Sequence, residues 1–162
     1  ALLALAAGLR EVTAERRAAL YINDRIDVAL AVGADGAHCP EAGFPPRDAR
    51  RLLGPDRAVG ASTHSVEGAR QAFEGDSDFV TFGPVFTTPS KSAWGAPQGL
   101  DALGRVCEAV GRPVYAVGGV TPDRAAACLQ RGAAGVAVVS AIMAARDIER
   151  VVNAFESALG RL

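Results

Sequence analysis

The stretch VYAVGGVTP (residues 114–122), followed by GVAVVSAI (135–142), decides the fold of this chain. Each stretch begins as an apolar, β-branched run too short for a helix, ends in small residues and passes into a helical pattern. A strand that stops at Gly-Gly or Ser-Ala before a helix leaves backbone N–H groups free and lets an oxyanion approach closely. Two such turns after consecutive parallel strands form the phosphate-binding site of a (β/α)₈ barrel. The chain is therefore expected to bind a small phosphorylated molecule.

The same alternation of strand and helix runs along the whole chain. Strands are expected at 19–23, 36–39, 58–62, 79–83, 113–118 and 135–140, and helices at 2–17, 24–32, 46–53, 65–73, 99–110, 122–130 and 148–159. The strands are continuous apolar runs, which is typical of parallel strands buried on both faces. In the first helix, Leu2, Leu5, Leu9 and Val12 form one apolar stripe. Only the connection 84–97 is long, and a long loop in a tight pattern indicates function.

The fold class that follows is α/β, a (β/α)₈ TIM barrel. Six strand–helix units do not close such a barrel, and the chain begins inside a helical pattern with no Met. The N-terminal strand–helix unit and the second strand are therefore expected to be missing from this chain. Residues 1–162 are expected to form one domain, a barrel incomplete at its N-terminal end, since 162 residues with 49% hydrophobic content suffice for one core. An open flavodoxin-like sheet is the alternative.

Composition narrows the class of partner. The net charge is -1 and the sequence pI is about 6.2, so nothing favours nucleic acid or an anionic membrane. No apolar run reaches the length of a bilayer span and no signal-peptide pattern opens the chain. The three cysteines (Cys39, Cys107 and Cys128) lack metal-site spacing. A cytoplasmic protein is expected, and the sequence leaves a homo-oligomer open.

Functional groups in parallel βα arrays collect at the carboxyl ends of the strands. The residues found there are rich in hydroxyls and amides: Asn23, Asp24, Arg25, His38, Glu41, Ser62, Thr63, His64, Thr87, Thr88, Ser90, Lys91, Gly118, Gly119 and Ser140. This set suits an anionic ligand and a divalent metal. No G-x-S-x-G nucleophile elbow is present, which argues against covalent hydrolysis.

Four further motifs carry a resemblance. YINDRIDVA (21–29), GADGAH (33–38), GASTHS (60–65) and FGPVFTTPSK (82–91), together with the two turns above, resemble the thiamin phosphate synthase/TenI family in residue type and order. For the synthase branch, the resemblance implies a TIM barrel that joins hydroxymethylpyrimidine diphosphate to thiazole phosphate with Mg²⁺.

The resemblance also implies a role for each matching residue. Asn23 would supply an amide contact and Asp24 would be a metal ligand. The contacts to the diphosphate would come from Ser62, Thr88, Ser90 and Lys91. The thiazole phosphate would be bound by backbone N–H groups of Gly119, Val139 and Ser140, with Gly118 as a further substrate-binding residue. Asn23, Asp24 and Lys91 are the predicted catalytic residues. A lysine and several hydroxyls can stabilise charge that develops on a leaving diphosphate.

One segment departs from the synthase pattern. In HCPEAGF (38–44), Gly43 stands where synthases carry the second metal-binding Asp, which predicts weakened Mg²⁺ binding. The segment resembles the TenI branch, so a thiazole tautomerase is the expected function. One tautomerase type has an acid/base His where this chain has Pro84, which leaves Asp24, Glu41, His64 and Lys91 as unranked proton-transfer candidates.

Three alternatives stay open. The chain could be a working thiamin phosphate synthase, a transferase. It could be a regulatory protein that binds thiazole phosphate without turnover. A different phosphate-binding barrel, such as those of tryptophan biosynthesis, is disfavoured by Asn23–Asp24–Arg25 and by the Thr-x-Ser-Lys motif ending at Lys91.

Overall fold

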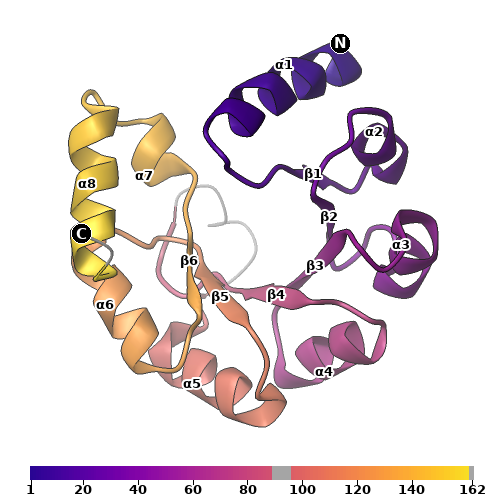
Figure 1. Ribbon diagram of the computed structural model, residues 1–162. Helices are drawn as coiled ribbons and strands as arrows, with labels where there is room; N and C mark the ends of the chain where they lie inside the picture. The colour runs from indigo at the N-terminus through magenta and orange to yellow at the C-terminus, as the bar shows by residue number, and fades with distance from the viewer. Residues whose placement is uncertain (89–95, 161–162) are drawn as a thin grey trace. The chain divides into compact units, whose positions relative to one another are not determined.

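The computed structural model describes residues 1–88 and 96–160, in which parallel strands alternate with helices (Figure 1). The chain divides into two compact units, one of residues Ala1–Ser62 and Gln71–Phe79, the other of Thr63–Arg70 and Val80–Leu162. Each unit is an α/β structure, as the sequence predicts. That residues 1–162 form one domain, with a strand–helix unit and a strand missing, stays a prediction.

The first unit contains three parallel strands and the helices that follow them. Its elements are α1 (Leu2–Glu15), β1 (Tyr21–Asn23), α2 (Ile26–Ala31), β2 (Gly36–Cys39), α3 (Pro46–Leu53), β3 (Ala58–Thr63) without its last residue, and the end of α4 (Val66–Glu74). Asn23 pairs with His38, and His38 with Gly60. This register aligns the carboxyl ends of the three strands, so the side chains that follow β1 and β2 meet at one edge.

The second unit repeats the arrangement. Its elements are the rest of α4, β4 (Phe79–Phe82) from Val80 on, α5 (Gly99–Val110), β5 (Val114–Val117), α6 (Pro122–Gln130), β6 (Gly135–Ala137), α7 (Ser140–Met143) and α8 (Ile148–Ala158). β4 pairs with β5 from Val80 and Val114, and β5 with β6 from Tyr115 and Gly135. Figure 1 shows α5, α6 and α8 along one side of these strands.

The core of each unit lies between the strands and their helices. In the first unit Ile22, Ala37 and Val59 are buried, and in the second Val80, Phe82, Val114 and Leu103 are buried. Because the strands carry small and β-branched side chains, helices pack closely against them. None of the helices in residues 1–88 and 96–160 combines the length and the apolar character of a bilayer span.

Two features of the elements are not evident from the sequence pattern, and one of them corrects the expected strand 135–140. The stripe of the first helix does not face the core: Leu2, Leu5, Leu9 and Val12 are exposed, and Ala6 is the buried residue of α1. The face of α1 toward the unit instead includes Arg10, which pairs with Asp35 at 2.7 Å. The last strand ends at Ala137, three residues early, because Ser140 opens the short helix α7 that periodicity does not reveal.

Candidate functional site

The predicted site residues lie at strand ends in both units. Asn23, Asp24 and Ser62 belong to the first unit, and Thr88, Gly118, Gly119, Val139 and Ser140 to the second. Ser90 and Lys91 lie outside the described residues.

Asp24 follows β1 in a left-handed backbone conformation, with φ 62°. Asp is among the residues that tolerate this conformation. Its N–H donates to the carbonyl of His38 at 2.8 Å, and its Oδ1 accepts the N–H of Phe44 at 3.0 Å. Arg25, and not Asp24, is the N-cap of α2. The carboxylate therefore links β1 to the segment after β2, beside exposed Asn23.

Gly43 lies directly against this carboxylate. A Cβ atom at Gly43 would be 2.5 Å from Asp24 Oδ1 and 2.8 Å from Pro40 Cδ. Both Gly43 and Asp24 border an open groove of about 590 Å³. No cluster of three or more His, Cys, Asp or Glu able to hold a metal is found among the described residues.

A single carboxylate still fits Mg²⁺ in one circumstance. Mg²⁺ in proteins keeps several waters and is commonly held by one or two carboxylates plus substrate phosphates. Asp24 is exposed, and its bond to Phe44 engages Oδ1 and not Oδ2. The residues present therefore suit a Mg²⁺ ion that arrives with a diphosphate, and not one held by protein alone.

His38 and Ser62 join the ends of β2 and β3. His38 Nε2 lies 3.0 Å from Ser62 Oγ, and the His38 ring packs at 5.9 Å from the ring of Phe79. Gly60 makes room for both rings, since a Cβ there would lie 2.6 Å from His38 Nδ1. Burial lowers the pKa of His38, so its neutral form is favoured at pH 7. The ring thus holds the Ser62 hydroxyl at the strand end; the sequence singled out both residues but not their contact.

Cys39 and His64 also lie at the ends of β2 and β3. Burial, and then the Asp24 charge, raise the pKa of Cys39 to about 11, which keeps its thiol protonated. His64, a proton-transfer candidate, is hydrogen-bonded through Nδ1 to the carbonyl of Gly83 in the second unit.

The second unit contains a cavity of about 190 Å³ at the ends of β5 and β6. It is lined by Pro84, Thr88, the turn 117–120 and the turn 137–141. Thr88 is 7% exposed, so this residue is buried where it lines the cavity. Five predicted binding residues of the second unit are thereby brought to one cavity: Thr88, Gly118, Gly119, Val139 and Ser140.

The glycine turn has the geometry that anion binding needs. Gly118 and Gly119 have φ 93° and 64°, a region that favours glycine. A Cβ at Gly119 would lie 2.5 Å from the Thr87 carbonyl oxygen, so neither the conformation nor the space admits a side chain. Within residues 1–88 and 96–160, no backbone carbonyl accepts the N–H of Gly119, Val139 or Ser140. These donors remain available to a ligand.

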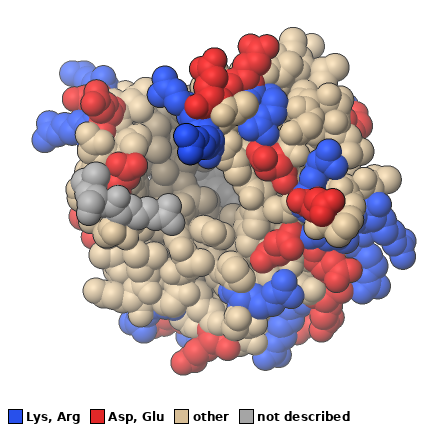
Figure 2. Space-filling view, in the orientation of Figure 1, with Lys and Arg blue, Asp and Glu red and all other residues tan. Residues whose placement is uncertain are grey.

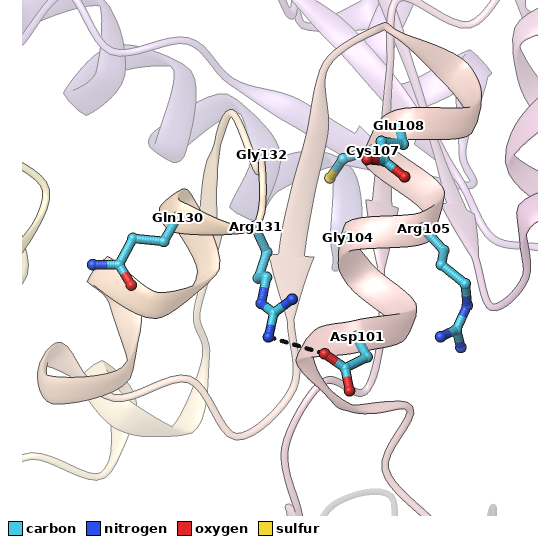
Figure 3. A pocket seen from close by; sticks show the side chains of 8 residues that line it. All are labelled: Asp101, Gly104, Arg105, Cys107, Glu108, Gln130, Arg131 and Gly132. Atoms are coloured by element: carbon cyan, nitrogen blue, oxygen red, sulfur yellow. Dashed lines mark ion pairs between the residues drawn. The ribbon is translucent and has the colours of Figure 1, made fainter.

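A larger groove lies away from the strand ends, between α5 and α6 (Figure 3). It measures about 650 Å³, and Figure 3 shows Arg131 and Asp101 meeting across it, with a 2.9 Å ion pair. Both side chains are largely exposed, so this pair contributes little to stability. Acidic and basic side chains alternate along the groove, which selects no class of ligand.

Surface charge agrees with the composition. In Figure 2, basic and acidic side chains are interspersed over the visible face, without a broad area of one sign.

Known proteins resemble this chain over most of its length. The family model described as thiamine monophosphate synthase matches residues 1–142. The thiamine-phosphate synthase of Moorella thermoacetica is 41% identical over 147 residues, which cover 91% of this chain and 70% of that protein. The bifunctional protein ThiM/ThiE of Symbiobacterium thermophilum is 47% identical over 142 residues, 88% of this chain and 30% of that protein.

Solved structures agree. The thiamine phosphate pyrophosphorylase of Pyrococcus furiosus superposes with a TM-score of 0.89 at 34% identity, covering 98% of this chain and 75% of that one. A 3-hexulose-6-phosphate synthase at 17% identity and a TM-score of 0.72 shares the fold. Since both the sequence model and a relative above 40% identity match most of it, this chain belongs to the thiamine monophosphate synthase family.

Proposed function

We propose that this chain is a thiamine-phosphate synthase that holds the phosphate of its thiazole substrate at the ends of β5 and β6. The observation that carries the proposal is the 190 Å³ cavity walled by two positive-φ glycines and the turn into α7. Its available N–H groups and small residues suit an oxyanion. The synthase names of the relatives favour this activity, and they lend no support to the tautomerase expected from the sequence.

In this proposal the chain's own residues have separate tasks. Gly119, Val139 and Ser140 donate backbone N–H groups to the thiazole phosphate, and Thr88 adds a hydroxyl at the cavity wall. The diphosphate of the pyrimidine substrate is assigned to Asn23, Asp24 and Ser62, with Ser90 and Lys91 assigned by resemblance.

The reaction breaks the bond between the pyrimidine methylene carbon and the diphosphate oxygen, and forms a bond from that carbon to the thiazole nitrogen. Negative charge grows on the departing diphosphate, so preorganised donors that face it lower the barrier. Ser62, held by His38, is one such donor. Mg²⁺, when bound beside Asp24, would neutralise part of the same charge.

Gly43 favours a second function. This chain has one carboxylate where the resemblance implies two in synthases. The second candidate is a protein that binds thiazole phosphate and either tautomerises the thiazole or performs no turnover. Such a protein would use the same β5–β6 cavity. This second candidate predicts ligand affinity without thiamin phosphate.

The deciding experiment incubates the protein with hydroxymethylpyrimidine diphosphate, thiazole phosphate and Mg²⁺. We expect thiamin phosphate and diphosphate to appear in equal amounts, because one bond breaks for each bond formed. Binding of thiazole phosphate with no thiamin phosphate at any Mg²⁺ concentration would replace the synthase by the second candidate.

Two variants at Gly43 test the role of the missing carboxylate. Gly43→Asp displaces Asp24 from its contact with Phe44 and adds a second acidic ligand, while Gly43→Ala displaces Asp24 alone. We expect Gly43→Asp to lower the Mg²⁺ concentration for half-maximal turnover about tenfold, the effect of roughly 1.4 kcal/mol. Gly43→Ala should not lower it, and equal behaviour of the two variants would dismiss the role assigned to the carboxylate.

A further inference from the structure

Arg124 has an unusual place in the fold. It lies in the first turn of α6, three residues after Thr121, the N-cap. A cation there is opposed by the helix dipole, which favours negative charge at that end. The motifs at the strand ends do not include Arg124. In the sequence, Arg124 is recognisable only as a basic residue at the start of a helix, five positions after Gly119.

Two contacts of the Arg124 side chain offset the unfavourable interaction with the helix dipole. Arg124 Nη1 donates to the carbonyl oxygen of Gly119 at 2.9 Å. Its guanidinium carbon lies 4.9 Å from the centre of the Phe86 ring, within the range of a cation–π contact. The side chain is therefore anchored to the glycine turn and to the loop after β4 at the same time.

Phe86 is itself tied to this turn. Its N–H donates to the carbonyl of Gly118 at 3.0 Å, so the carbonyls of Gly118 and Gly119 are both engaged by groups outside the turn. In a planar trans peptide the C=O and the following N–H point in opposite directions. Fixing the Gly119 carbonyl thus fixes the N–H of Val120.

Val120, the residue that carries this N–H, lines the cavity. Gly118, Gly119 and Val120 all line the 190 Å³ cavity, and no backbone carbonyl in the described part of the chain accepts the Val120 N–H. Two consecutive donors, from Gly119 and Val120, are thereby oriented away from Phe86 and Arg124.

We propose that Arg124 is a positioning residue of the phosphate-binding site. It orients the Gly119–Val120 peptide so that the N–H of this peptide donates to the phosphate of the ligand. Arg124 acts through the turn and does not touch the ligand. The inference rests on the proposed function for the location of the phosphate, and adds a residue that the family resemblance does not supply.

The test uses isotope-labelled protein with inorganic phosphate and thiazole phosphate as probes. Arg124→Met keeps an unbranched stem but removes the donor, and Arg105→Met on α5 is the matched control. We expect Arg124→Met to weaken binding of both probes about tenfold, the range of one lost hydrogen bond to a charged group. It should also lower the NMR order parameter of the Val120 amide in the free protein, because the peptide loses its restraint. Arg105→Met should change neither the affinity nor the order parameter.

Arg124→Lys separates positioning from direct attraction. Lysine retains the charge but not the planar group that bonds a carbonyl while stacking on a ring. If Arg124→Lys restores affinity while the Val120 order parameter stays as low as in Arg124→Met, the charge acts directly and the positioning role is overturned. Unchanged affinity and an unchanged Val120 order parameter in Arg124→Met overturn it as well.

The wild-type protein distinguishes this failure from failure of the proposed function. If neither probe shifts the Gly119, Val120 and Ser140 amides of the wild type, the cavity does not hold phosphate, and both proposals fall together. If the probes shift those amides and the variants behave like wild type, only the role of Arg124 falls.

Discussion

Gly119 is the residue on which the site depends most. Its φ of 64° requires the left-handed region, and its Cα hydrogen faces the backbone of the loop after β4. The sequence alone predicts that Gly119 belongs to the site. A strand that ends in Gly-Gly before a helix is typical of a turn that needs positive φ values. Its contacts with Phe86 and Thr87 were not predictable, since they depend on a loop distant in sequence.

Gly119→Ala should lower both stability and binding. A methyl group there would lie 2.5 Å from the Thr87 carbonyl oxygen and 2.9 Å from Phe86 Cβ. Gly33→Ala is the control, because Gly33 has a similar φ of 61° with no atom within 4 Å of its Cβ position. Each alanine costs about 1–2 kcal/mol for the left-handed backbone. Crowding should add roughly 1–3 kcal/mol in Gly119→Ala alone.

Urea unfolding of the two variants and titration with thiazole phosphate measure these effects. Gly119→Ala should be the less stable variant and should lose thiazole phosphate binding, while Gly33→Ala keeps it. Equal stability together with retained binding in Gly119→Ala would show that the turn has room for a side chain.

At the scale of the elements, periodicity predicts the order of strands and helices, because buried parallel strands and amphipathic helices leave distinct patterns. The stop of β6 at Ala137 and the helix α7 are not predictable from periodicity, since four residues are too few to show a helical repeat. The apolar stripe on α1 is a separate case. An apolar stripe marks a face that can be buried, and in the described residues that face is exposed.

The contact between β2 and β3 leads to a pH prediction. Burial lowers the pKa of His38 in the folded chain below its usual value of about 6.5. Between the folded pKa and about 6.5, the unfolded chain binds more protons at this position than the folded chain does. The free energy of unfolding should therefore fall as pH is lowered through this interval and should be insensitive to His38 above it.

Urea unfolding at several pH values between about 5 and 8 tests the prediction, a window in which His is the side chain that ordinarily titrates. His38→Gln should remove this part of the pH dependence. His64→Gln, a change at the other histidine, should leave it in place. If His38→Gln and wild type show the same pH dependence, burial of His38 does not shift its titration.

For the whole molecule, family membership was predictable from the order of the motifs between Tyr21 and Ile142, and both the family model and the relatives confirm it. The choice between synthase and tautomerase was not predictable, because it turns on the segment around Gly43. There Asp24 accepts the Phe44 N–H, a contact between residues twenty positions apart. Ser90 and Lys91 remain predictions from resemblance.

The central claim is that the cavity at the ends of β5 and β6 recognises the phosphate of a thiazole substrate. The most direct measurement compares the Kd of thiazole phosphate with that of the same thiazole bearing a free hydroxyl, while the backbone amides are observed. We expect the phosphate to bind at least tenfold more tightly, a difference of about 1.4 kcal/mol or more, and to shift the amides of Gly119 and Ser140. Equal Kd values, or shifts confined to residues outside the cavity, would contradict the claim.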